Sequence, residues 1–175
     1  MKNSKSRIQN IRFVVCLCFT VAFFMSSCGY RIVGSTFLPF NAVTIKPVQN
    51  ETYEPQLEDK MHIALSNEFI NQGIEVKASE GNIDIEATIT KYALGAIGAV
   101  DETVKEQQII MYVDVKFIDE GKITEFSKMQ SPIRITFQTT GTIGEAVARQ
   151  EEATVKACRE IAQEIVSKLI IVYAK

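Results

Sequence analysis

The chain has 175 residues, and its 19 basic and 21 acidic side chains give a formal net charge of −2 at neutral pH. This length suits one domain with one hydrophobic core, and the sequence lacks the basic surplus that nucleic-acid-binding proteins normally carry. One histidine and four cysteines, two of them inside an N-terminal apolar run, do not form a recognisable zinc motif. We therefore expect no nucleic-acid partner, no metal and no cofactor.

Residues 1–27 have the pattern of a secretory signal. An apolar run from Phe13 to Met25 follows four basic residues, and no acidic residue precedes its end. Thirteen residues at ~1.5 Å each form about 20 Å of helix, too short for a hydrocarbon core of roughly 30 Å. A basic segment, a short apolar segment and a small-residue end are typical of an export signal. A single membrane-spanning anchor is the alternative interpretation.

The end of this run, Met25-Ser26-Ser27-Cys28, resembles a bacterial lipobox, in which small residues precede a lipidated cysteine. On this resemblance Cys28 becomes the first mature residue and carries acyl chains on its sulfur and its amine. Each buried CH₂ contributes ~0.8 kcal/mol, so three chains hold a protein firmly on a membrane. Gly29, in place of the aspartate that retains lipoproteins in the inner membrane, implies the outer membrane. We expect a signal peptide at 1–27, a lipidated lead at 28–41 and a single domain at 42–175.

The lead is followed by a predicted strand and a predicted helix. Residues 42–50 alternate apolar and polar side chains, and Pro47 places this strand at an edge or ends it. Between Pro55 and Gln72 the apolar residues recur at helical spacing. They are Leu57, Met61, Ala64, Leu65, Phe69 and Ile70. Gly73 suits the left-handed position that ends a helix.

Three further strands are predicted from a period of two. They cover residues 82–90, residues 107–119 and, after a turn at 119–121, a last segment that includes 122–126 and 133–139. One apolar face per strand is typical of a sheet that is covered on one side. Residues 94–100, Leu-Gly-Ala-Ile-Gly-Ala-Val, are interpreted as a flexible hairpin tip. They precede no periodic helix, so they do not meet the context of a phosphate-binding loop.

The last element is a long helix. Thr142 and Glu145 have the spacing of a capping box. An apolar stripe then runs through Val147, Cys158, Ile161, Ile165, Leu169 and Val172. Cys158 is interpreted as a buried small hydrophobe rather than a reactive thiol. The predicted fold class is α+β: a two-layer sandwich of order βαβββα, with a mixed four-stranded sheet and two helices packed on one face.

The sequence has no recognisable catalytic constellation. His62 lies off the apolar stripe of its helix, and no serine or cysteine forms a recognisable catalytic motif with it. The acidic pairs, such as Glu58-Asp59 and Glu151-Glu152, are adjacent in sequence, and neighbours at i, i+1 on a helix do not face each other. We interpret them as solvated surface and predict that the protein is not an enzyme.

The mature sequence resembles the LptE family of lipopolysaccharide-assembly lipoproteins. The resemblance begins at Cys-Gly-Tyr-Arg-Ile-Val-Gly-Ser-Thr-Phe-Leu-Pro, residues 28–39, directly behind the lipobox. It continues through VTIKPVQNETYEPQLEDKMHIALSNEF, IDIEATITKYALGAI and EQQIIMYVDVKF, and ends in the closing helix, AVARQEEATVKACREIAQEIVSKLI. These segments follow one another in the order of the family's elements and cover nearly the whole mature chain.

The resemblance implies a partner and a ligand. LptE proteins occupy the lumen of LptD, the outer-membrane β-barrel that delivers lipopolysaccharide to the cell surface, and help this barrel assemble. Lipopolysaccharide phosphates favour cationic contacts. The candidate residues are Arg149, at the start of the closing helix, and Lys105, in the tip between the second and third strands, with ordinary solvated charges as the alternative. A different outer-membrane lipoprotein, one that activates a periplasmic cell-wall synthase, is the second functional hypothesis. A lipid-anchored hydrolase is the third, and it lacks a nucleophile and a base.

Overall fold

The computed structural model describes residues 38–100 and 103–173. The chain divides into two units, Met1–Val33 and Gly34–Lys175, and all described residues belong to the second unit. The predicted signal peptide, Cys28 and most of the predicted lead therefore lie outside the described residues.

The first predicted strand is divided in two by Pro47. Strand β1, Ala42–Ile45, is fully buried, and the two-residue strand β2, Gln49–Asn50, follows after Lys46-Pro47-Val48. Both strands run parallel to β4, with Val43 opposite Ile83 and Gln49 opposite Thr88. Proline lacks the N–H that a sheet ladder needs. The pairing with β4 therefore stops at Ile45, opposite Ile85, and resumes at Gln49, opposite Thr88.

Helix α2, Leu57–Asn71, confirms the predicted first helix. Its buried face includes Leu57, Met61, Leu65 and Phe69, whereas Ile70, expected on that face, is 59% exposed. Gly73 follows in the left-handed conformation with φ 76°, as predicted for a helix end. The chain then returns as β3, Glu75–Lys77, which pairs in parallel with β1. This strand was not predicted, because three residues with two charges carry no apolar alternation.

Strands β4, Ile83–Val100, and β5, Thr103–Asp119, form one long antiparallel hairpin. The interpretation of residues 94–100 as a hairpin tip is wrong, because they continue β4 and pair with the first part of β5. Register shifts between Ile89 and Lys91 and near Gly98 interrupt the alternation. Such bulges insert an extra residue into one strand and leave the pairing continuous on both sides. Gly95 therefore pairs regularly within the strand, opposite Gln108, and Gly98 adjoins register shifts, so neither glycine marks a loop.

The last predicted strand is also divided. Strands β6, Lys122–Met129, and β7, Ile135–Gln138, both pair with β5, at its second and first halves respectively. Pro132 lies in the connection between them. The sheet contains seven strands, in the order β3-β1-β4-β5-β6 with β2 beside β4 and β7 beside β5. The predicted four-stranded sheet is thus corrected to seven strands, while its mixed character is confirmed.

Helix α3, Ile143–Tyr173, begins with the predicted capping box. The Glu145 N–H donates to Thr142 Oγ1 at 3.3 Å, and the Thr142 N–H donates to Glu145 Oε2 at 2.8 Å. These reciprocal bonds satisfy donors that a helix start otherwise leaves free. The Thr142 hydroxyl also donates to Glu145 Oε2, at 3.0 Å. The bond from the Thr142 backbone and then this hydroxyl bond lower the pKa of Glu145. The helix start is therefore fixed by side chains that the sequence alone identified.

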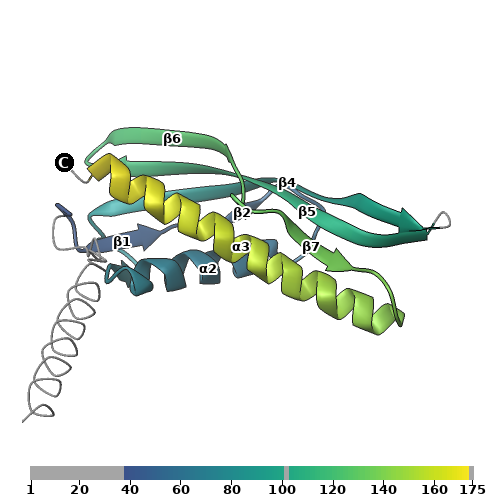
Figure 1. Ribbon diagram of the computed structural model, residues 1–175. Helices are drawn as coiled ribbons and strands as arrows, with labels where there is room; N and C mark the ends of the chain where they lie inside the picture. The colour runs from purple at the N-terminus through teal and green to yellow at the C-terminus, as the bar shows by residue number, and fades with distance from the viewer. Residues whose placement is uncertain (1–37, 101–102, 174–175) are drawn as a thin grey trace, which may run out of the picture. The chain divides into compact units, whose positions relative to one another are not determined.

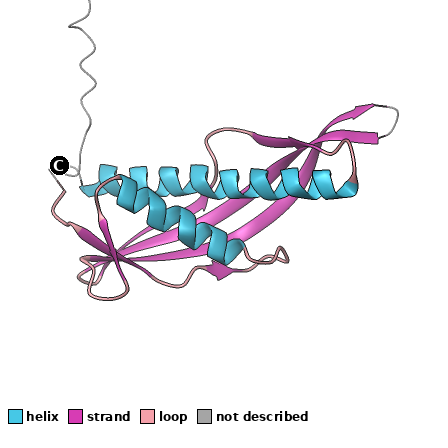
Figure 2. Ribbon diagram, turned by 90° about the horizontal axis from the view of Figure 1, so that it is seen from below, coloured by secondary structure: helices cyan, strands magenta, loops and turns pink. Residues whose placement is uncertain are grey.

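Both helices pack on the same side of the sheet, as Figure 2 shows. The apolar faces of β4 and β5 meet the buried stripes of α2 and α3, and Phe69, Phe117, Ile161 and Leu169 are among the fully buried side chains. The predicted inward faces of β4 and β5 are confirmed from Ile83 to Ile89 and from Ile109 to Phe117. Within the described part of the chain, no helix is long and apolar enough to span a membrane.

Candidate interaction surfaces

The domain has two different ends. At one end, the chain enters the domain at residues 38–40, and the Phe40 ring packs edge-on against Tyr173, with ring centroids 5.3 Å apart. Helix α3 of 31 residues extends from there for about 46 Å at ~1.5 Å per residue. At the other end lie the β4–β5 hairpin beyond Tyr92, strand β7 and the first turns of α3, as Figure 1 shows. We call this second region the distal end.

Arg149, a sequence candidate for lipopolysaccharide contact, lies at the distal end. Its guanidinium group donates from Nε to the Gln138 carbonyl at 2.8 Å and from a terminal nitrogen to the Thr140 carbonyl. It thus ties the first turns of α3 to the end of β7. The residue is only partly exposed, and part of its hydrogen-bonding capacity is used inside the protein. Arg149 therefore has a structural role that sequence reasoning did not anticipate.

Lys105, the second candidate, belongs to β5 and not to a tip between strands. Its neighbour in sequence, Glu106, pairs with Gln138, whose carbonyl accepts the bond from Arg149. The fold thus brings the Lys105 backbone and Arg149 to the same end of the domain, although they are far apart in sequence.

Several apolar side chains are exposed at the distal end. Ile143 and Val147, one turn apart on α3, are 86% and 60% exposed, and Leu94 and Ile97 of β4 are 40% exposed. Val147 was predicted to be buried, because it continues the stripe of α3. The sheet does not cover this part of the helix, and burial begins only at Ala153. Exposed apolar residues also lie elsewhere, such as Ile70 and Ile171, and a single one is ordinary. The four at the distal end are the ones that we consider as candidate contact residues.

The distal half of the hairpin is connected to α3 through Tyr92. Its hydroxyl lies 2.9 Å from Thr154 Oγ1, and Gln150 Nε2 donates to the same hydroxyl at 3.5 Å. Burial raises the pKa of Tyr92. The bulge after Ile89 shifts the alternation, so that Tyr92 pairs with Met111 and lies on the helix side. The sequence alone does not identify this contact, because it depends on the bulge after Ile89.

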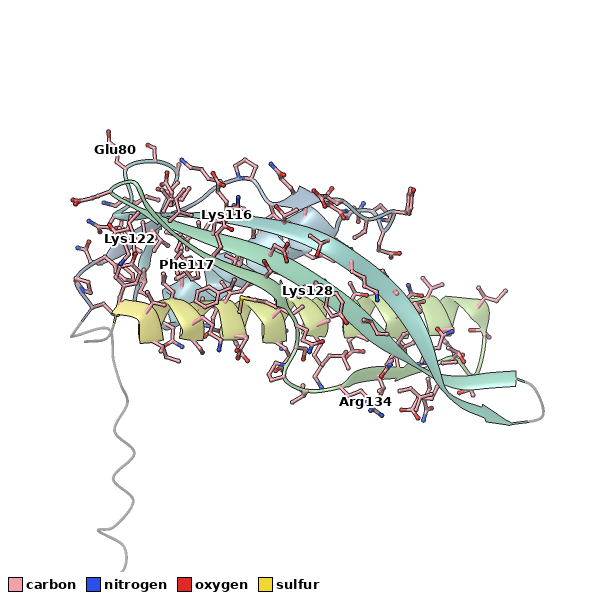
Figure 3. The ribbon with its side chains drawn as sticks, turned by 90° about the horizontal axis from the view of Figure 1, so that it is seen from above. Glu80, Lys116, Phe117, Lys122, Lys128 and Arg134 are labelled. Atoms are coloured by element: carbon pink, nitrogen blue, oxygen red, sulfur yellow. The ribbon has the colours of Figure 1, made fainter. Side chains whose placement is uncertain are left out.

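The sheet face opposite the helices, seen in Figure 3, is charged over its first half. Lys46 pairs with Asp84 at 2.8 Å and Lys116 with Glu125 at 3.2 Å. The side-chain oxygen of Asp114 accepts the Lys128 N–H at 2.7 Å. The two ion pairs place positive and negative side chains next to each other, and exposed pairs of this kind contribute little to stability. They leave no surplus of one charge that would identify a polyanionic or polycationic partner.

The structure describes no arrangement suited to catalysis. Cys158 is buried, as predicted, and burial raises the pKa of its thiol to about 12. His62 is partly exposed on α2, as predicted for a residue off the apolar stripe. Across residues 38–100 and 103–173, no group of three or more metal-ligating side chains is close enough to hold a metal ion.

These observations define a two-layer α+β domain with a mixed sheet, an extended hairpin and an apolar distal end. A family model described as LptE, lipopolysaccharide-assembly, matches residues 40–169. The chain belongs to the LptE family, as its sequence resemblance indicated. No curated protein sequence matches the chain significantly.

Several solved structures are similar to this chain at low sequence identity. A Xanthomonas campestris protein is 12% identical with a TM-score of 0.53, over 81% of this chain and 91% of that chain. An uncharacterised lipoprotein B from Nitrosomonas europaea is 19% identical, with a TM-score of 0.49, over 78% and 87%. The rare lipoprotein B from Shewanella oneidensis is 12% identical, with a TM-score of 0.47, over 75% and 98%. At 12% identity, the likeness to the Xanthomonas campestris protein shows a similar fold only.

Proposed function

We propose that this protein is an outer-membrane lipoprotein, anchored through Cys28, that assembles with an LptD-type β-barrel. In this role it fills the barrel lumen, helps the barrel fold, and takes part in the delivery of lipopolysaccharide to the outer leaflet. The role involves no covalent chemistry. Membership of the LptE family supports this proposal, and so does the lipobox-like end of the N-terminal apolar run.

The observation that carries the proposal is the apolar distal end. Ile143 and Val147 project from α3 where the sheet no longer covers the helix, and Leu94 and Ile97 add apolar surface on the neighbouring hairpin. Exposed apolar residues that gather at one place mark protein contact sites. A stable complex buries at least about 1,000 Å² in total, and a protein enclosed by a barrel would bury more. The distal end is the part of the domain that we assign to this contact.

Arg149 and Lys105 remain our candidates for lipopolysaccharide phosphates. The Lys105 backbone and Arg149 both belong to the distal end. Arginine binds phosphate with two parallel hydrogen bonds, whereas lysine acts as a compact charge. Since Arg149 also holds the start of α3, a test of this role must separate binding from local stability.

Co-purification tests the proposal. The full chain, extracted from membranes in detergent, should isolate a large integral β-barrel protein. The variant Val147→Glu, which places a charge in the apolar distal end, should recover less barrel. Lys156→Glu changes an exposed charge on the same helix beyond that surface and should recover as much as the wild type. Recovery of a periplasmic cell-wall synthase in place of a barrel would favour the alternative function.

A further inference from the structure

The helix layer has a groove on its surface between α2 and α3, the two helices that Figure 2 shows on one side of the sheet. This α2–α3 groove has a volume of about 380 Å³. Its lining includes Ile63 and Ile70 of α2, each 59% exposed, and Val155 of α3, which is 39% exposed. Packing against the sheet does not account for side chains with this exposure. Exposed apolar side chains that gather in one place are typical of a contact site.

One cation in the lining of the groove has no partner of opposite charge. Lys60 already pairs with Glu151 of α3 at 3.2 Å, and the Glu68 carboxylate accepts a hydrogen bond from the Gln72 amide at 2.9 Å. Arg159 lines the groove, is exposed, and forms no salt bridge with any residue that the structure describes. A complementary occupant therefore carries an apolar side chain for the groove and a carboxylate for Arg159.

Helix α3 itself carries both of these features on its exposed side. Glu151, Val155 and Arg159 are exposed and follow one another at intervals of four residues, so they form one ridge along the helix. Ridges of this spacing pack against each other in the commonest class of helix crossing. The adjacent Glu152 is exposed and, among the described residues, forms no salt bridge. The ridge thus has carboxylates on one side of Val155 and a guanidinium group on the other.

This order of charges makes the ridge complementary to itself in one orientation. When two copies of α3 cross in antiparallel directions with Val155 opposite Val155, Glu151 of each copy lies opposite Arg159 of the other. A parallel arrangement would place Arg159 opposite Arg159, and like charges in contact cost several kcal/mol. An antiparallel pair is also what a two-fold axis across the helix generates, because such an axis brings the same surface of both copies together.

We propose that the α2–α3 face is a dimerisation surface, at which a second copy of this chain packs its α3 ridge in the antiparallel direction. Val155 of each copy then packs against the groove of the other, beside Ile63, and Arg159 pairs with Glu151 and Glu152 of the second copy. This inference goes beyond the proposed function, since it concerns chains outside any complex with a barrel. In those chains the dimer covers apolar side chains that water otherwise meets.

The size of the surface indicates a weak dimer. A protein interface of standard size uses roughly 20–30 residues from each partner. The α2–α3 groove is lined by ten residues, and the ridge beside it adds Glu151 and Glu152. The contact is therefore smaller than the standard size, and the dimer should dissociate on dilution.

Sedimentation equilibrium of the full chain in a density-matched detergent tests the proposal. The wild type should change from monomer to dimer as the protein concentration rises. Arg159→Glu places a carboxylate opposite Glu151 of the second copy and should weaken the association by about tenfold or more, because like charges at an interface are costly. Arg134→Glu makes the same change of charge at an exposed site outside the groove and should associate as the wild type does.

A cysteine at the proposed two-fold axis tests the geometry independently. Val155→Cys places two thiols opposite each other, as the short Cβ separation of a disulfide requires, so mild oxidation should link two copies. Ile171→Cys is the control, at a position that is 70% exposed and about 24 Å further along α3 at ~1.5 Å per residue. It should link far fewer chains. Cys158 is buried and does not contribute.

Three results would overturn the proposal. They are a wild type that stays monomeric at every concentration, equal association of the wild type and Arg159→Glu, and Val155→Cys linking no more chains than Ile171→Cys. Co-purification of the barrel with Arg159→Glu should match that with the wild type, because we assign the barrel contact to the distal end. Failure of this inference therefore leaves barrel recovery unchanged, whereas failure of the proposed function removes it.

Discussion

Individual side chains in this domain are defined by their surroundings more than by their chemical type. Cys158 is a thiol, yet it packs as an apolar group inside α3, and burial raises its pKa to about 12. Arg149 is a cation, yet its guanidinium group bonds two backbone carbonyls. The helical stripe sufficed to predict the burial of Cys158. No sequence pattern predicts the Arg149 bonds, because they depend on where β7 ends in space.

The Cys158 thiol should be unreactive in the folded protein. With a pKa of about 12 it stays protonated at pH 8, and only the thiolate reacts with alkylating reagents. Iodoacetamide should label it only after unfolding. The unfolded thiol ionises at ordinary pH values near 9, below the folded pKa, so its contribution to stability is present at pH 8 and falls as pH rises. The stability difference between wild type and Cys158→Ala, measured by denaturant unfolding, should therefore narrow between pH 8 and pH 10.5. Rapid native labelling would contradict this account.

Lipidation of Cys28 is a separate prediction at the residue scale. The apolar run that ends in Ser-Ser-Cys implies that Cys28→Ala blocks acylation and leaves an uncleaved precursor. Metabolic labelling with a fatty acid analogue, followed by mass determination of the product, measures both effects. Cys16→Ala changes a cysteine inside the apolar run and should leave labelling intact. Persistent labelling of Cys28→Ala would show that the acyl chain is attached elsewhere.

Lys105 and Arg149 make a third prediction, which separates ligand contact from helix support. Lys105→Gln should weaken binding of lipopolysaccharide without changing hydrogen exchange at the start of α3. Arg149→Lys keeps the charge but loses the fork that bonds Gln138 and Thr140, so exchange over residues 143–152 should become faster. If Lys105→Gln binds lipopolysaccharide as tightly as the wild type, Lys105 is an ordinary surface charge.

At the scale of elements, the periodicity of apolar residues predicts the long helices and strands but not the strands of two or three residues. Both helices and the inward faces of β4 and β5 follow directly from apolar spacing. Strands β2 and β3 have two and three residues, too few for any alternation, and they form because β1 and β4 provide a partner edge. The hairpin tip was misplaced for a related reason. Gly95 and Gly98 resemble a turn locally, yet both lie within β4, where Gly95 pairs regularly with Gln108 and Gly98 adjoins register shifts. Tertiary pairing decides these cases.

The capping box is the element that can be tested most simply. Thr142→Ala should lower the free energy of unfolding by about 1 kcal/mol, the usual value for losing such a cap. Glu145→Ala should also destabilise the helix start. The hydrogen bonds from Thr142 lower the pKa of Glu145, so its contribution is present above the unfolded pKa and is lost as pH falls through the folded pKa. The stabilities of wild type and Glu145→Ala, followed by circular dichroism, should therefore converge in acid. A constant difference down to pH 3 would contradict this assignment.

At the scale of the whole molecule, the described domain places different surfaces at its two ends. The chain enters beside Tyr173, and α3 extends about 46 Å away from this point. The apolar side chains of Ile143 and Val147 lie at the far end. The sequence alone could not predict this surface, because the apolar stripe identifies which residues of the helix are apolar but not where the covering sheet stops.

Photo-cross-linking in cells tests the central claim most directly. A photoreactive amino acid at Val147, 60% exposed at the distal end, should capture an integral outer-membrane β-barrel protein. The matched control is Ile171, which is 70% exposed near the other end of α3, and it should capture that barrel less efficiently. Mass spectrometry identifies the captured protein in each case. Our account predicts one barrel protein, recovered chiefly through Val147, and capture of a cell-wall synthase with no barrel from either position would contradict it.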